Sequence, residues 1–143
     1  MKAIGYYSTP RPDRRGGGSA IIFDENKFNV KHYQPDNPDN LEVTFGILEP
    51  KDDGAKNLKI ILCALYSPPK SRKKPKLVNF ITAIYHQLKF KYQDAYFMLG
   101  GDINELDKQL LLNISPMFQQ IVTKPTRKDK ILSVIVTDLH QYY

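Results

Sequence analysis

The sequence has one cysteine, no tryptophan and no long hydrophobic run. A single cysteine, Cys63, cannot form an intrachain disulfide, so a hydrophobic core has to hold the fold together. No stretch reaches the ~18 apolar residues of a membrane span, and residues 1–15 lack the apolar segment of a secretory signal. These absences predict an intracellular protein with no membrane partner.

Acidic residues are also few: 15 Asp and Glu stand against 21 Lys and Arg, which gives a formal charge of +6. The excess is concentrated in KSRKKPK, residues 70–76, whose basic members are Lys70, Arg72, Lys73, Lys74 and Lys76. Such a cluster can bind a nucleic-acid backbone, because each neutralised phosphate releases counterions. A solvated loop and a nuclear import signal have the same composition, and the residues alone leave these alternatives open.

The apolar residues form short runs separated by turn residues. With 143 residues, 41% of them hydrophobic, the chain is long enough for one domain with its own core. Runs rich in β-branched and aromatic residues predict strands. These runs are Ser19–Phe23, Phe28–Tyr33, Leu41–Leu48, Leu58–Tyr66, Ala95–Leu99 and Ile131–Thr137.

One segment has the spacing of a helix instead. In PKLVNFITAIYHQLKFKYQ, residues 75–93, apolar residues recur every three or four positions, and Pro75 stands near the first turn. A second, shorter helix is predicted at Leu106–Asn113. Several strands followed by one long helix, a strand, a short helix and a last strand indicate an α/β chain of the α+β kind, with a layered sheet and flanking helices.

The predicted strand Ala95–Leu99 leads directly into GGDIN, residues 100–104. If the backbone stays extended, the Asp102 carboxylate and the Asn104 amide point the same way, and the glycines let a substrate approach. Such a pair suits a hydrated Mg²⁺ ion beside a phosphate. The alternative is a plain turn in which Asn104 caps a helix that starts at Glu105.

Four motifs in order connect these observations. They are RRGGGSAIIF, LYSPP, LGGDIN, and KPTR followed by an apolar strand. Together they resemble the endonuclease/exonuclease/phosphatase superfamily, and within it the apurinic-type endonuclease domain of non-LTR (LINE, jockey-like) retrotransposons. The resemblance runs over 14–143, and residues 1–13 are set apart as a polar segment with one candidate strand at most.

The resemblance implies a partial four-layered α/β sandwich with mixed or antiparallel sheets. It also implies a Mg²⁺-dependent phosphodiesterase that nicks DNA, working in the nucleus beside a reverse transcriptase, with RNA as a further partner in a retroelement particle. Tyr66 matches the family tyrosine near the scissile phosphate, Asp102 the aspartate that orients or activates water, and Asn104 the asparagine that contacts phosphate. Arg127 in KPTR would add a phosphate contact. The oligomeric state stays open.

The sequence also departs from the family pattern. The principal metal-binding glutamate should precede RRGGG, but residues 1–15 contain no glutamate and Glu25 comes too late. Ser133 stands where the family has an aspartate that orients a catalytic histidine. Asp138 and His140 lie one residue too far apart, and too early, to replace the closing Ser-Asp-His. We therefore assign no metal ligand and predict weak or absent activity for the chain alone.

Two other functions are compatible with the residues. A basic module that binds nucleic acid without cutting it would use the lysine-rich segment rather than GGDIN. A phosphatase for a small phosphorylated metabolite or lipid would use the same scaffold on a different substrate. His32 and His86 have no partner pattern and receive no chemical role.

Overall fold

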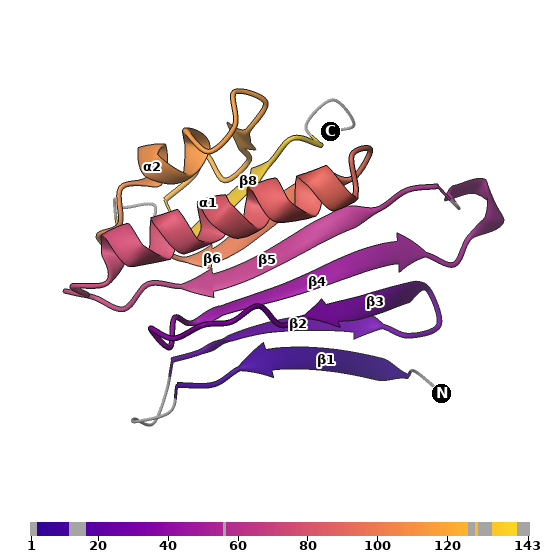
Figure 1. Ribbon diagram of the computed structural model, residues 1–143, viewed down its shortest axis with the longest axis horizontal. Coiled ribbons are helices and arrows are strands. Elements are labelled where there is room, and N and C mark those ends of the chain that lie inside the picture. The colour runs from indigo at the N-terminus through magenta and orange to yellow at the C-terminus, as the bar shows by residue number, and fades with distance from the viewer. Residues whose placement is uncertain (1–2, 12–16, 56, 126–127, 129–132, 140–143) are drawn as a thin grey trace.

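The computed structural model describes residues 3–11, 17–55, 57–125, 128 and 133–139, and in them strands outnumber helices (Figure 1). The elements are β1 (Ile4–Thr9), β2 (Ser19–Asp24), β3 (Phe28–Tyr33), β4 (Val43–Pro50), a 3-10 turn at Asp53–Ala55, β5 (Ile60–Tyr66), α1 (Lys74–Lys91), β6 (Tyr96–Asp102), α2 (Lys108–Leu112), β7 (Gln119–Gln120) and β8 (Ser133–Thr137). The α/β class predicted from the sequence is confirmed. Neither described helix has both the length and the apolarity needed to cross a bilayer.

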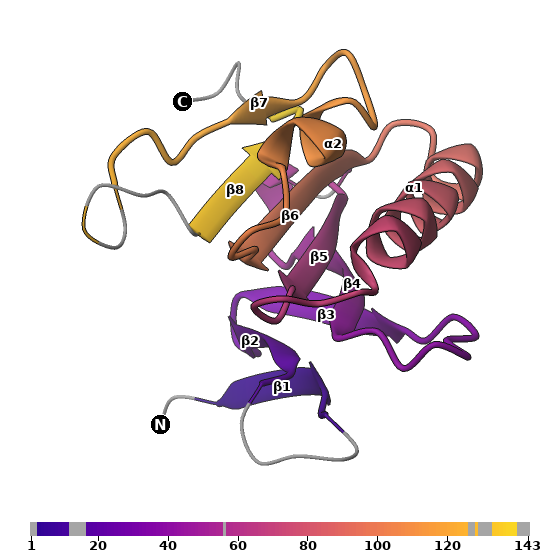
Figure 2. The ribbon, with the colours of Figure 1, turned by 90° about the vertical axis from the view of Figure 1, so that its left-hand side faces the viewer.

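The described strands form two sheets. Six of them, in the order β3-β4-β5-β6-β8-β7, make the main sheet, and β1 and β2 make a separate antiparallel pair. In the main sheet β5 and β6 are parallel, whereas the other neighbours are antiparallel. Helix α1 lies across one side of the main sheet, and the β1–β2 pair lies on the other side (Figure 2). The order of layers is therefore helix, main sheet, small sheet.

The core fills the space between α1 and the main sheet. Phe97 and Leu99 on β6 are completely buried, as is Ile81 on the facing side of α1. The Tyr85 ring meets the Phe97 ring edge-on, with 5.0 Å between centroids. Buried residues of α1 recur at helical spacing, which confirms the predicted long helix.

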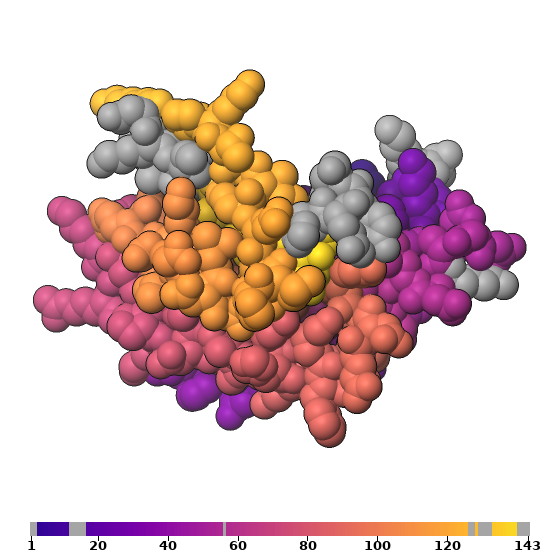
Figure 3. All heavy atoms as spheres, turned by 90° about the horizontal axis from the view of Figure 1, so that it is seen from above, coloured from indigo at the N-terminus to yellow at the C-terminus, as the bar shows by residue number. Residues whose placement is uncertain are grey.

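The segment after β6 closes one end of this core. Leu111 of α2 is completely buried, and the Phe118 ring stacks on Phe97 at 5.6 Å between centroids. Seen from above, this segment (orange) lies beside α1 (rose) on the surface of the molecule (Figure 3). Helix α2 starts at Lys108, later than the predicted start at Leu106.

The polar segment 1–13 contains β1, which the predicted strands do not include. Strand β1 pairs with β2 from Ile4 opposite Asp24 to Thr9 opposite Ser19. The Thr9 hydroxyl also donates to the Val43 carbonyl at 2.9 Å, which ties this layer to β4. The described part of 1–13 therefore belongs to a layer of the fold, and the predicted boundary at residue 13 falls outside the described residues.

Candidate active site at the ends of β5 and β6

The parallel pairing of β5 and β6 brings Tyr66 and Asp102 together. They are partners in the strand register and the last residues of their strands. Partners in register project from the same face of a sheet. Because Leu65 is buried in the core beneath α1, both side chains lie on the opposite face, towards β2. The Ser67 amide also donates to the Asp102 carbonyl at 2.9 Å, which fixes the two strand ends to each other.

Gly101 makes this close pairing possible. Its φ is +155°, and a Cβ placed on it would stand 1.8 Å from the Leu65 carbonyl oxygen. No residue with a side chain fits there without moving β5 away from β6. The alternative of a plain turn at the two glycines is wrong, because β6 continues through them to Asp102. Gly101 accommodates the neighbouring strand rather than a substrate.

Asn104 bridges the two strand ends. Its backbone amide donates to Asp102 Oδ1 at 3.1 Å, and its side-chain Nδ2 donates to the Ser67 carbonyl at 2.8 Å. Its φ of +46° is left-handed, a conformation that Asn tolerates better than most residues. The extended backbone expected at this position is therefore wrong. The alternative role as a helix cap is also wrong, because Asp107 caps α2 by accepting from the Gln109 amide at 2.9 Å.

Ser67 adds a polar atom that the sequence gave no reason to select. The residue is completely buried, and within the described part of the chain its hydroxyl has no hydrogen-bond partner. A buried hydroxyl left without a partner costs about 1–3 kcal/mol. Water or a ligand oxygen is therefore a favoured partner for this hydroxyl, beside the bridge made by Asn104.

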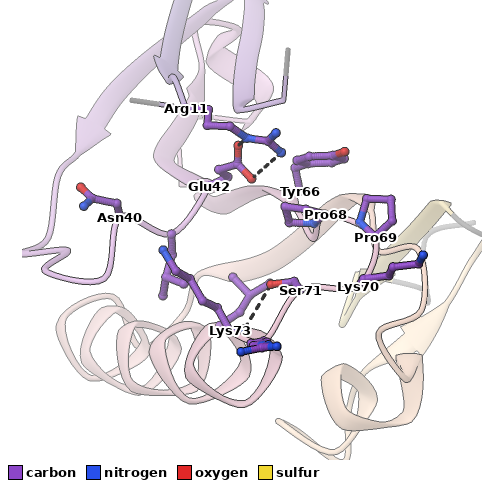
Figure 4. A pocket seen from close by; sticks show the side chains of 12 residues that line it. Arg11, Asn40, Glu42, Tyr66, Pro68, Pro69, Lys70, Ser71 and Lys73 are labelled. Atoms are coloured by element: carbon purple, nitrogen blue, oxygen red, sulfur yellow. Dashed lines mark hydrogen bonds and ion pairs between the residues drawn. The ribbon is translucent and has the colours of Figure 1, made fainter. Parts of the chain in front are cut away.

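An arginine–glutamate pair supports Tyr66 from the β1–β2 side (Figure 4). Glu42 is only 7% exposed and accepts from Arg11 Nε at 2.6 Å and from the Gly18 amide at 2.9 Å. The guanidinium carbon of Arg11 lies 5.5 Å from the Tyr66 ring centroid, within cation–π range. The hydrogen bond to Glu42 raises the pKa of Arg11. The sequence does contain a hint, since a carboxylate inside the apolar run LEVTFGIL needs a buried partner.

The lysine-rich segment follows the Tyr66 turn and is partly neutralised. Lys74 Nζ lies 3.7 Å from Glu105 Oε2, and Lys76 Nζ lies 3.0 Å from Asp39 Oδ1. Both pairs are solvent-exposed, so salt screens them and they contribute little to stability. Their effect is to remove part of the local positive charge.

The remaining cations of this segment keep their charge. Within the described residues, Lys70 and Arg72 have no ion pair through their side chains, and Lys73 Nζ donates to the neutral backbone carbonyl of Asp39 at 2.8 Å. These three side chains all line the same hollow beside Tyr66. The positive charge available to an anion therefore borders this hollow, with the Lys73 ammonium on the rim at Asp39.

The other residues singled out in the sequence have different positions and roles. Ser133, the first residue of β8, is the register partner of Asp102, so a serine does lie beside the candidate site. The Asp138 carboxylate accepts from the Phe97 amide at 2.8 Å and holds the strand end, which is a structural role. Arg127 and His140 lie outside the described residues.

The carboxylates near the site determine how well it suits a metal ion. The described residues contain no group of three or more His, Cys, Asp or Glu that could hold one. Glu42 is paired with Arg11, and Glu105 accepts from the Lys70 amide at 2.6 Å, so of these described carboxylates Asp102 is the one without a cationic partner. A single carboxylate fits Mg²⁺ only when water and a substrate phosphate supply the other ligands. The site is thus open rather than a closed protein cage.

Comparison with known proteins supports the fold. No family model and no curated protein matches the sequence. Solved structures similar to it include an endonuclease/exonuclease/phosphatase family protein from Bacteroides thetaiotaomicron (14% identity, TM-score 0.67, covering 94% of this chain and 60% of that one). Two others are the mannosyl-6-phosphatase Bt3783 of the same bacterium (14%, 0.67, 94% and 62%) and D. rerio TDP2 complexed with a single-strand DNA product (14%, 0.52, 94% and 61%).

At this level of identity, the similarity shows a shared fold. The mixed sheet and flanking helices of this chain match the endonuclease/exonuclease/phosphatase type of fold, as the sequence motifs predicted. The chain spans between 60% and 62% of the length of these three structures.

Proposed function

We propose that the chain is a phosphodiesterase-type hydrolase domain that acts on DNA and derives from the endonuclease of a non-LTR retrotransposon. The observation that supports this most strongly is the register pairing of Tyr66 with Asp102, bridged by Asn104 and bordered by uncompensated cations. The motifs RRGGG, LYSPP, GGDIN and KPTR support the retroelement origin. The same proposal places the activity in the nucleus, with RNA as a partner of the parent polyprotein.

In the proposed reaction each side chain acts on a different part of the phosphodiester. Asp102 accepts a proton from a water molecule, whose oxygen forms the new bond to phosphorus while the bond to the 3′-oxygen breaks. The Tyr66 hydroxyl and the free N–H of Asn104 donate to the phosphoryl oxygens as negative charge grows on them. The leaving 3′-oxygen takes its proton from solvent and becomes a 3′-hydroxyl. A bound Mg²⁺ ion, held by Asp102 together with the phosphate, would supply further charge neutralisation.

The proposed mechanism also predicts low activity. The proposed reaction assigns none of the described side chains to protonate the leaving oxygen, and Ser133 occupies the register position opposite Asp102. A serine hydroxyl cannot stabilise a protonated histidine as a carboxylate does. The loss of such a supporting group commonly lowers activity by about 10- to 100-fold.

Nicking of supercoiled plasmid in the presence of Mg²⁺ tests the proposal. We expect slow conversion to open circles by the chain and none by Asp102→Ala. Asp94→Ala is the matched control, because Asp94 is an exposed carboxylate in the loop before β6, away from the site. Nicking that survives in Asp102→Ala would come from a contaminant or another group and would refute the assignment.

The second candidate function is DNA binding without cleavage, which the free charges of Lys70, Arg72 and Lys73 favour. It predicts an affinity that falls steeply with salt and drops when Lys73 and Lys74 are neutralised. It also predicts that Asp102→Ala binds DNA as well as the unchanged protein does. Fluorescence anisotropy with a labelled duplex at several salt concentrations separates this function from the first.

The third candidate is a phosphatase for a small phosphorylated substrate. Its support is the fold shared with the mannosyl-6-phosphatase Bt3783. Release of inorganic phosphate from a sugar phosphate, lost in Asp102→Ala, would favour it over DNA cleavage. Fold similarity alone does not select a substrate, so this candidate ranks below the other two.

A further inference from the structure

A hollow of about 350 Å³ lies beside Tyr66 on the side away from β6 (Figure 4). Its walls come from the segment before β4, the turn after β5 and the beginning of α1. The residues that form them include Asn40, Leu41, Tyr66, Pro68, Lys70 and Leu77. The volume falls at the lower end of the ~300–1,000 Å³ range of small-molecule sites. The hollow is therefore large enough for a compact ligand group, and the proposed reaction does not use it.

The inner wall of the hollow is apolar and firmly held. Leu41 and Leu77 are 4% and 3% exposed, so the core beneath fixes both. Pro68 and Pro69 form a second rigid surface, because their rings lock the backbone of the turn. A flat, largely apolar ring fits between such surfaces, as flipped bases do between aromatic and apolar side chains.

The rim of the hollow differs from one side to the other. Lys70, Arg72 and Lys73 line the side formed by the turn and the start of α1, and their charges are not compensated by a carboxylate within the described residues. On the β1 side, Arg11 and Glu42 compensate each other. An anionic group therefore prefers the side of the turn, where Lys70 and Arg72 follow Pro68 and Pro69, to the β1 side.

Asn40 supplies a recognition group on the rim beside Lys73, whose Nζ donates to the carbonyl of the preceding residue, Asp39. It is exposed, and its side chain has no hydrogen bond to another described residue. Its φ of +51° is maintained by the loop, in which Asn37 bonds both the amide and the carbonyl of Leu41. A side-chain amide offers one acceptor and two donors, which suits the polar edge of a nucleobase.

We propose that this hollow binds one unpaired nucleotide of the DNA strand, next to the phosphate that faces Asp102. The base lies on Leu41, Leu77 and the prolines, its edge meets Asn40, and its phosphate lies on the lysine-rich side. This inference rests on the proposed function and deepens it, because Tyr66 is both a wall of the hollow and the partner of Asp102. Its consequence is a preference for single-stranded or frayed DNA over a closed duplex.

Binding without Mg²⁺ tests the inference separately from catalysis. The probes are two fluorescein-labelled single strands of equal length, one with ordinary bases and one with abasic units throughout, and a blunt duplex of the ordinary sequence. We expect the ordinary strand to bind at least about fivefold more tightly than the abasic strand, because base stacking on protein surfaces contributes roughly 1–3 kcal/mol per base. The duplex should bind like the abasic strand. Equal affinity for both single strands would overturn the proposal.

Variants locate the effect in the hollow. Asn40→Gly keeps the left-handed backbone and removes the side-chain amide. The ratio of the affinities for the ordinary and the abasic strand should therefore fall at least about twofold. Lys108→Ala on α2 is the control and should leave this ratio unchanged. Asn40→Asp, which tolerates the same φ, provides the second variant, and circular dichroism checks that both fold. An unchanged ratio in both folded variants would contradict the role of Asn40. An affinity ratio above fivefold without nicking that depends on Asp102 would refute only the proposed catalysis. Nicking that depends on Asp102, together with equal affinity for the two strands, would refute only the nucleotide site.

Discussion

The two sides of the main sheet are built differently. On the α1 side, Phe97 and Leu99 are completely buried. On the other side, the small β1–β2 sheet leaves Ile4, Tyr6 and Ile22 at 65%, 70% and 72% exposure. Tyr66 and Asp102 stand on this more open side, at the ends of strands whose opposite face is packed. The contrast teaches that one face of a sheet can supply the stability while the rim of the other supplies the chemistry.

Truncation of a core side chain tests this contrast and is expected to cause the largest loss of stability. Phe97→Ala removes a completely buried ring that contacts Tyr85 and Phe118, and such changes cost about 3–5 kcal/mol. Ile22→Ala on the exposed layer should change stability by less than about 0.5 kcal/mol. Urea unfolding followed by circular dichroism measures both. Similar losses for the two variants would show that the small sheet contributes as much as the core.

Thiol labelling provides a probe of the packed side that needs no mutation. Cys63 on β5 is 2% exposed, and burial raises the pKa of its thiol well above the ordinary value, so little reactive thiolate forms. We expect labelling by a disulfide reagent in the native protein to be about a hundredfold slower, or more, than in denaturant, because opening the core costs several kcal/mol. Fast labelling of the native protein would mean that the α1 side opens readily.

Substitutions at two neighbouring glycines test the region where the packed side of the sheet meets the candidate site. Gly101→Ala sets a methyl group against the Leu65 carbonyl, at a position where it would stand 1.8 Å away, and should cost about 1–3 kcal/mol or more. Gly100→Ala is the matched control, because its nearest neighbour would be the Val134 carbonyl oxygen at an ordinary 3.6 Å. Thermal unfolding compares the two. Equal melting temperatures would contradict the close approach of β5 and β6.

The smallest expected effect is a pH dependence of the open side. Burial lowers the pKa of His32, whose ring stacks on Tyr7 at 4.5 Å, so the folded protein favours neutral imidazole. The unfolded chain then binds more protons between the lowered pKa and the ordinary one near ~6.5, and stability falls as the pH drops through that window. His32→Phe should weaken this pH dependence, by less than the loss of stability expected for Gly101→Ala. His86→Gln, on the exposed part of α1, should leave the pH dependence unchanged. Urea unfolding at pH 7.5 and pH 5 measures it.

Much of the fold could be predicted because its elements have clear local patterns. Strand β3 has the predicted limits, and α1 differs from the predicted segment by one or two residues at each end. Strand β1 was allowed only as one candidate strand without limits, because its apolar residues Ile4 and Tyr6 are exposed and do not mark a buried face. The continuation of β6 through Gly100 and Gly101 was missed because glycine is a poor strand residue except where another backbone comes close.

The site could be predicted in its residue types but not in its geometry. The sequence indicated Tyr66, Asp102 and Asn104, yet Asn104 is left-handed because the chain turns after Asp102 to bury Ile103, which is 2% exposed. That turn depends on the packed core as well as on the local bond from the Asn104 amide to Asp102 Oδ1. The contact between Arg11 and Glu42 joins residues 31 positions apart and depends on the pairing of two sheets. Local patterns cannot reveal such tertiary contacts.

The course of the chain through β5, α1 and β6 has a consequence for inheritance. The phenol, the carboxylate, the bridging amide and the cationic loop all belong to the single stretch from Tyr66 to Asn104. A recombination event with breakpoints on either side of this stretch would move the whole arrangement as a unit. Related genes that differ in the β1–β2 layer or in the segment after Asn104 would therefore keep the relative positions of these groups.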